Sequence, residues 1–93
     1  MAANNEIGTL SDLRAVSAIA HAHGAALFSD ATQAVGKIDL DCDALGVDML
    51  ALSAHKFYGP KGVGALVAHS GMSIAPLMSG GPHERRVRPG TLN

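Results

Sequence analysis

Residues 49–62 read MLALSAHKFYGPKG, an apolar run that passes directly into a polar segment with two glycines and a proline. The apolar part, residues 49–52, predicts a short strand buried on both faces, since it does not alternate with polar residues. A second run of this kind, residues 25–28, ends near Ser29 and Asp30. Two short buried strands joined by a crossover favour an α/β fold with a parallel sheet.

Local signals predict the other elements. Ser11 is a good N-cap for a helix over residues 12–23, and Gly24 supplies a left-handed stop after it. The apolar stripe of this helix is expected at Leu13, Val16, Ile19 and Ala20. The remaining elements are a crossover over residues 30–48 with a helical turn at 43–45, a third strand over 63–68 that folds back on the second, and a loop over 79–93.

Composition limits the classes of protein that fit. The chain has 93 residues and a net charge of −1, which allows one small domain and argues against nucleic acid or an anionic membrane surface as the main partner. Cys42 is the single cysteine, so no intrachain disulfide can form and a reducing, cytoplasmic location is expected. No apolar run approaches the roughly 20 residues of a membrane span, and no signal peptide is visible.

The two predicted buried strands end in polar residues, and ligands of open α/β sheets bind beyond the carboxyl ends of strands. The residue types match what pyridoxal phosphate needs. Lys56 offers an amine, and Asp30 an acid for the pyridine nitrogen. Ser53 and His55 suit the phosphate, and Gln33 suits the ring oxygen. The sequence therefore predicts a pyridoxal-phosphate site.

Ordered motifs carry a family resemblance over essentially the whole chain. The chain resembles the cysteine desulfurases, which belong to the class V aminotransferase family of fold-type I pyridoxal-phosphate enzymes. The motifs are NNEIG at 4–8, DATQ at 30–33, SAHK at 53–56, YGPKG at 58–62, GGPHER at 80–85 and RPGT at 88–91. One departure is Pro82, which stands where a third glycine is common.

The resemblance implies a fold and a set of site residues. Residues 1–93 are expected to be part of the pyridoxal-phosphate-binding large domain, with a mostly parallel sheet and flanking helices. The implied roles are the Schiff-base lysine for Lys56, the partner of the pyridine nitrogen for Asp30, the ligand of the ring oxygen for Gln33, phosphate ligands for Ser53 and His55, an active-site asparagine for Asn5, and a ligand of the neighbouring subunit's phosphate for Thr91.

The resemblance also implies an activity for a parent enzyme. Family members take sulfur from L-cysteine, leave alanine, and pass the sulfur as a persulfide to an acceptor protein, as in iron–sulfur cluster assembly; they form homodimers. The family's cofactor-stacking histidine, sulfur-accepting cysteine and carboxylate-binding arginine are not in this chain. We therefore expect an internal fragment that is inactive and poorly folded alone. The alternatives are a selenocysteine lyase, an aminotransferase, or an inactive truncated product that only binds a partner.

Competing site hypotheses are weaker. Residues 59–64 lack the Ser or Thr that follows the lysine of a nucleotide phosphate loop. Residues 39–43 resemble the start of a calcium loop, but Ala44 replaces the required glycine. His21 and His23 point to different faces of a helix, so no metal site is expected. The arginines 85, 86 and 88 either bind a phosphate or support their loop, and the sequence leaves both open.

Overall fold

The computed structural model describes residues 1–93 and contains a three-stranded sheet with the strand order β1-β2-β3. β1 pairs with β2 in parallel, and β2 pairs with β3 antiparallel. The α/β class is confirmed, and the sheet within this chain is mixed. The elements are α1 (Leu13–Ala22), β1 (Phe28–Asp30), α2 (Cys42–Leu45), β2 (Met49–Ser53), the 3-10 turn η1 (Ala54–Lys56), β3 (Gly64–Ala68) and the 3-10 turn η2 (Glu84–Arg86).

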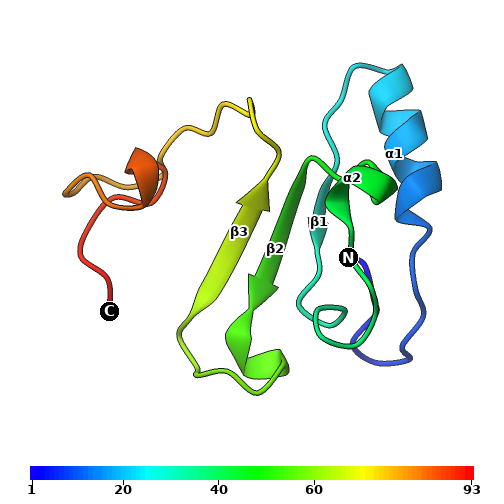
Figure 1. Cartoon of the computed structure of the whole chain (residues 1–93), viewed down its shortest axis with the longest axis horizontal. Coiled ribbons are helices and arrows are strands. Elements are labelled where there is room, and N and C mark those ends of the chain that lie inside the picture. The colour runs from blue at the N-terminus through cyan, green and yellow to red at the C-terminus, as the bar shows by residue number, and fades with distance from the viewer.

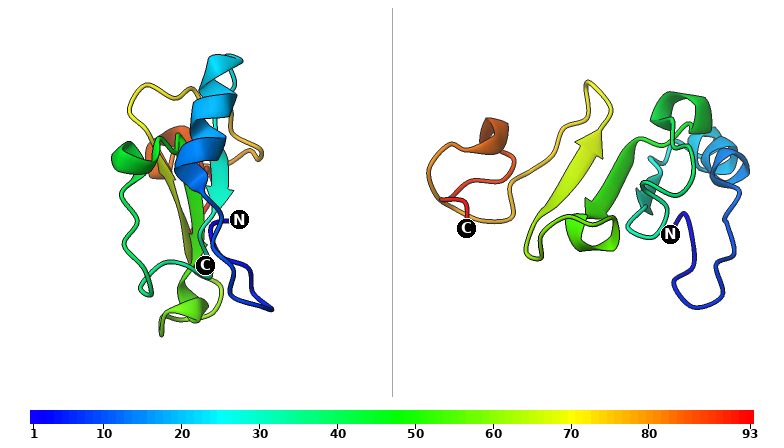
Figure 2. Two further views of the ribbon diagram at one scale, coloured as in Figure 1. Left: turned by 90° about the vertical axis from the view of Figure 1, so that its right-hand side faces the viewer. Right: turned by 60° about the horizontal axis from the view of Figure 1, so that its bottom comes forward.

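The elements lie in a row rather than around one centre (Figure 1). Both helices lie on the β1 side of the sheet, and the segment after β3 lies on the opposite side; Figure 2 shows the same order from a second direction. The chain is correspondingly flat, with extents of 39 × 34 × 18 Å. No helix combines the length and apolarity that crossing a membrane requires.

Helix α1 begins one residue later than predicted. Asp12, not Ser11, is the N-cap, because its carboxylate accepts the Ala15 N–H at 3.0 Å while the Ser11 hydroxyl donates to the Met1 carbonyl at 2.9 Å. Gly24 has the predicted left-handed backbone, with φ of 69°. The buried residues are Leu13 and Ser17, whereas the predicted stripe residues Val16 and Ile19 are exposed.

Strand β1 is shifted toward the carboxyl end of the predicted run. The cause is Asp48, whose carboxylate accepts the Leu27 N–H at 2.7 Å and so takes the donor that a longer ladder would use. Ladder pairing therefore starts at Phe28, which is in register with Met49. The predicted helical turn is present as α2, with Asp41 accepting the Ala44 N–H and Gly46 in the left-handed region. Asp41, which belongs to the calcium-loop-like pattern at residues 39–43, is thus the N-cap of a short helix.

The core is small and built mainly from alanine. Leu50, on the middle strand, belongs to it and is 3% exposed. The first two strands were expected to be buried on both faces, but only Ser29 of β1 and Leu50 of β2 are buried. The third strand, β3, is exposed throughout. Both helices lie beside β1, so neither covers β3 (Figure 1). The full core cluster is Ala2, Ala3, Leu13, Ala31, Ala34, Val47 and Leu50.

Candidate active site

The carboxyl ends of β1 and β2 meet at one end of the sheet, because the two strands are parallel. Asp30 is the last residue of β1 and is in register with Ala51. β2 continues to Ser53 and passes without a gap into η1, whose last residue is Lys56. The structure thus brings the two predicted groups, the acid and the amine, to the same end of adjacent strands.

Asp30 is held as a carboxylate by the residue two positions further on. The Thr32 N–H donates to Asp30 Oδ1 at 2.8 Å. Hydrogen bonds from the side chain and the backbone N–H of Thr32 lower the pKa of Asp30 below its ordinary value of 3.8. The backbone of Asp30 is fixed as well, since its carbonyl accepts the Ala2 N–H at 2.7 Å. Asp30 is therefore both a turn-stabilising residue and a fixed negative charge at the sheet end.

Ser53 and His55 form a polar pair beside Lys56. Ser53 Oγ and His55 Nδ1 are 2.8 Å apart, so the two side chains point toward one another from the end of β2 and from η1. Lys56 itself is exposed and has no hydrogen-bond partner from within the chain. A hydroxyl and an imidazole in contact, with a free amine one residue away, form a donor cluster that suits an anionic group.

Asn5 and Gln33 line a common cavity of about 480 Å³ between the N-terminal loop and the turn after β1. Gln33 Oε1 accepts a hydrogen bond from Lys37 Nζ at 3.3 Å, and Asn5 Nδ2 donates to Glu6 Oε1 at 3.2 Å. These contacts occupy one polar atom of each side chain and lie near the carboxyl end of β1.

Thr91 is the one predicted site residue that lies in a segment apart from the others. It follows η2 in the segment beyond β3, on the far side of the sheet from β1 (Figures 1 and 2). This segment is fastened by Arg88, whose Nη1 donates to the carbonyls of Gly90 and Thr91 at 2.9 and 3.2 Å. Of the two roles left open for the arginines, loop support therefore applies to Arg88.

The residues present fit pyridoxal phosphate by their chemistry. The fixed charge of Asp30 suits a protonated pyridine nitrogen, and the pair of Ser53 and His55 suits a phosphate. Lys56 supplies an amine at the same end of the sheet. The turn that carries Lys56 is closed by Gly59, where a Cβ would stand 2.7 Å from the Ala54 Cβ. The roles of Thr32 and Gly59 were not predicted; Asp-x-Thr after a strand is a recognisable turn signal that could have indicated the first.

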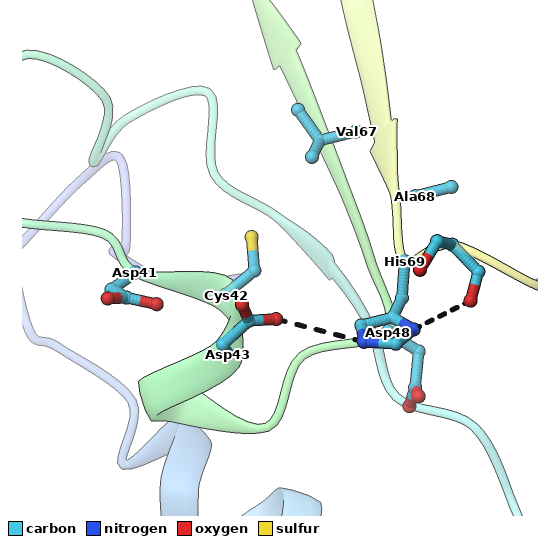
Figure 3. A pocket seen from close by; sticks show the side chains of 8 residues that line it. Asp41, Cys42, Asp43, Asp48, Val67, Ala68 and His69 are labelled. Carbon is cyan, nitrogen blue, oxygen red and sulfur yellow. Dashed lines mark hydrogen bonds and ion pairs between the residues drawn. The ribbon is translucent and has the colours of Figure 1, made fainter.

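A second cavity, of about 340 Å³, lies at the opposite end of the sheet (Figure 3). Asp43 and His69 face one another across it, with Oδ1 and Nε2 3.8 Å apart, and His69 Nδ1 donates to the Ser70 carbonyl at 2.9 Å. Cys42, which begins α2, is also in its lining. No group of three His, Cys, Asp or Glu residues is placed to hold a metal ion.

Ser17, His21 and Asp48 form a hydrogen-bonded series between α1 and the start of β2. His21 Nε2 lies 2.8 Å from Asp48 Oδ2, and Ser17 Oγ lies 3.4 Å from His21 Nδ1. This order resembles a nucleophilic triad, but Ser17 is 3% exposed and donates its proton to the Gly46 carbonyl at 2.6 Å. The series therefore fastens α1 to the sheet. Sequence reasoning missed it, because Asp48 is 27 positions from His21.

Comparison with known proteins gives matches over the whole chain. The family described as aminotransferase class-V matches residues 1–91. Cysteine desulfurase IscS from Dictyoglomus turgidum is 52% identical over 93 residues, which are 100% of this chain and 24% of that protein. The chain therefore spans about a quarter of the length of this relative.

Solved structures agree. The NifS-like protein from Rickettsia africae superposes with a TM-score of 0.93 at 39% identity, over 99% of this chain and 26% of that one. A structure of SspA in complex with cysteine superposes with a TM-score of 0.90 at 40% identity, over 97% of this chain and 26% of that one. Fold and sequence thus match the same group of enzymes.

Proposed function

The chain belongs to the class-V aminotransferase family, and from that membership we propose that it is a segment of the cofactor-binding domain of a pyridoxal-phosphate enzyme that removes sulfur from L-cysteine. The observation that carries the proposal is the parallel pairing of β1 with β2, which puts Asp30 and Lys56 at one end of the sheet in a chain that matches cysteine desulfurases from end to end. The SspA relative, solved in complex with cysteine, supports the substrate.

Each residue of the sheet end has a task in this proposal. Lys56 holds the cofactor through its amine and, when released, carries the proton at its Nζ. Asp30 keeps a negative charge beside the pyridine nitrogen, and its hydrogen bond from Thr32 keeps it oriented. Ser53 and His55 hold the phosphate. When bound, pyridoxal phosphate supplies an electron sink for the bonds at the substrate's α-carbon.

Gln33 and Asn5 extend the site from the neighbouring cavity that both residues line. Gln33 donates from its amide to the ring oxygen, since its Oε1 already accepts from Lys37. Asn5 faces the cofactor from the N-terminal loop. Both assignments follow the family motif, and the shared cavity supports them.

Thr91 contributes to the cofactor site of the neighbouring subunit rather than to the site of its own chain. Its segment lies on the far side of the sheet from Asp30, which fits a residue that reaches the phosphate in a neighbouring subunit (Figure 1). The functional unit is thus a homodimer, and the sulfur passes to an acceptor protein. Cys42 is unpaired, which fits a reducing compartment such as the cytoplasm.

The test requires a full-length enzyme, because the chain spans 24% of the Dictyoglomus turgidum relative. The 93 residues replace the segment that they match in that relative; we call the product the chimeric enzyme. It is reduced with borohydride in the presence of pyridoxal phosphate, and the modified lysine is located by mass spectrometry. Alanine and sulfide from L-cysteine are measured in parallel.

We expect the label on Lys56 and alanine formation from L-cysteine. Lys56→Ala is expected to lose both, whereas Lys61→Ala, which removes a nearby lysine of the same polar segment, is expected to keep both. A label on another lysine, or alanine formed at an unchanged rate by Lys56→Ala, would show that the assignment is wrong. A selenocysteine lyase would instead prefer selenocysteine, and an aminotransferase would form a keto acid.

A further inference from the structure

The turn that carries Lys56 is closed on a single residue, Ala54. The Ala54 carbonyl accepts two N–H donors from the far side of the turn, Phe57 at 3.1 Å and Gly59 at 2.9 Å. The Ala54 N–H donates to the Val63 carbonyl at 2.9 Å, so the start of the turn is also tied to the approach to β3. Ala54 is 8% exposed, and it therefore forms the buried anchor of the turn.

Gly59 packs directly against this anchor. A Cβ at Gly59 would stand 2.7 Å from Ala54 Cβ and 3.0 Å from Ala54 O, and most of that obstacle is rigid backbone or the first side-chain atom. The left-handed residue of the turn is Tyr58, with φ of 68°, and Gly59 is not among the residues with positive φ. The requirement for glycine at position 59 is therefore one of space, not of backbone conformation.

The next strand is held against the same end of β2 in a similar way. Gly64 is in register with Ser53, and a Cβ at Gly64 would stand 2.6 Å from the Leu52 carbonyl oxygen. The residues that lead into the lysine turn thus have a close backbone neighbour at β3. A displacement forced at Gly59 has little room on that side, so it must be absorbed by the residues between the two ends of the turn, which include Lys56.

We propose that Gly59 is a positioning residue for Lys56: its close contact with the Ala54 Cβ sets where the lysine amine stands at the carboxyl ends of β1 and β2. The inference rests on the proposed function and adds to it a residue that acts through Lys56. Misplacement of a reacting group by about 1 Å can cost on the order of 100-fold in rate. A substitution that relieves the Gly59–Ala54 contact can distinguish a positioning role of Gly59 from a general role in folding.

The experiment compares four forms of the chimeric enzyme: unsubstituted, Gly59→Ala, Ala54→Gly, and the double variant Ala54→Gly/Gly59→Ala. Three properties are measured in each: the fraction of Lys56 labelled by borohydride with pyridoxal phosphate, the pH midpoint of the absorbance of the lysine-bound cofactor, and the rate of alanine formation. The first two report on Lys56 directly, and a purely structural role of Gly59 would not move them in folded protein.

We expect Gly59→Ala to lower the labelled fraction, to shift the pH midpoint, and to slow alanine formation by roughly 100-fold. Ala54→Gly keeps values near the unsubstituted form. The double variant recovers most of the loss, because the Cβ–Cβ conflict at 2.7 Å is gone. If Gly59→Ala is recovered only unfolded, the same argument expects the double variant to be folded and labelled at Lys56.

Two results overturn the positioning role alone, both with the unsubstituted form labelled at Lys56. One is a folded Gly59→Ala variant with an unchanged labelled fraction, pH midpoint and rate. The other is a double variant that is as impaired as Gly59→Ala, folded or not, since the conflict with the Ala54 Cβ, at 2.7 Å, would then not be the cause. Absence of label at Lys56 in the folded, unsubstituted chimeric enzyme refutes the proposed function, and the positioning role falls with it.

Discussion

Replacing Leu50 with alanine perturbs the strand that supports the lysine turn. Leu50 is 3% exposed and is paired with Ser29 of β1 on one side and Val67 of β3 on the other. The substitution removes three carbons from the core, at about 0.8 kcal/mol each. Incomplete collapse of the cavity brings the expected loss of stability to about 2–5 kcal/mol.

Amide hydrogen exchange in the chimeric enzyme measures this loss where it occurs. At about 1.4 kcal/mol for each factor of ten, exchange in the peptides that contain β1 and β2 should accelerate by roughly 30-fold to several thousand-fold. Leu50→Met keeps the volume and should cost less than about 1.5 kcal/mol, which is below roughly 15-fold. Equal exchange in the two variants, or less than 15-fold acceleration for Leu50→Ala, would refute the view that Leu50 holds the sheet centre.

Three further outcomes are expected. Ser29→Ala should leave stability equal or higher, because the buried Ser29 hydroxyl has no hydrogen-bond partner. Ser17→Ala should cost about 1 kcal/mol, because it removes the hydroxyl that donates to the Gly46 carbonyl; thermal melts of the two variants of the chimeric enzyme measure both effects. The hydrogen bond from His21 lowers the pKa of Asp48 below the ordinary carboxyl value of 3.8. Docking of α1 should therefore be strongest above pH 3.8 and be lost as the pH falls below that value; circular dichroism measures the loss of helix, and Asp48→Asn should remove the pH dependence. Arg86→Gly should raise the melting temperature, since a left-handed backbone, here φ of 66°, costs a non-glycine residue about 1–2 kcal/mol; an unchanged melt would contradict it.

Local chemistry predicted the elements well and their ends less well. Ser11 and Asp12 are both good N-caps, and the choice between them depends on the Met1 carbonyl, which takes the Ser11 hydroxyl. The start of β1 depends on the Asp48 carboxylate, which is 21 positions away from Leu27 in the sequence. In both cases a side chain's partner comes from another part of the fold, and propensity and periodicity do not contain that information.

The same holds for the site: sequence patterns predicted part of it, and the rest depends on contacts in the folded structure. The run from β2 into SAHK predicted that Lys56 follows a strand, and parallel pairing then places it beside the end of β1 with Asp30. The contact between Gly59 and Ala54 could not be predicted, because a glycine followed by proline reads as an ordinary turn and shows nothing of the close approach. Spacing indicates which residues carry chemistry, whereas the residues that orient them are found from three-dimensional contacts.

The antiparallel pairing of β2 with β3 has a consequence for the order of folding. The segment from Ala54 to Val63 is the loop of a hairpin whose strands are neighbours in the sequence, whereas β1 joins β2 only across the whole crossover. Because closing a shorter loop costs less chain entropy, we expect the hairpin to form before β1 docks. The lysine turn would then already be shaped in the early folding nucleus, and the acid at Asp30 would arrive last to complete the pair.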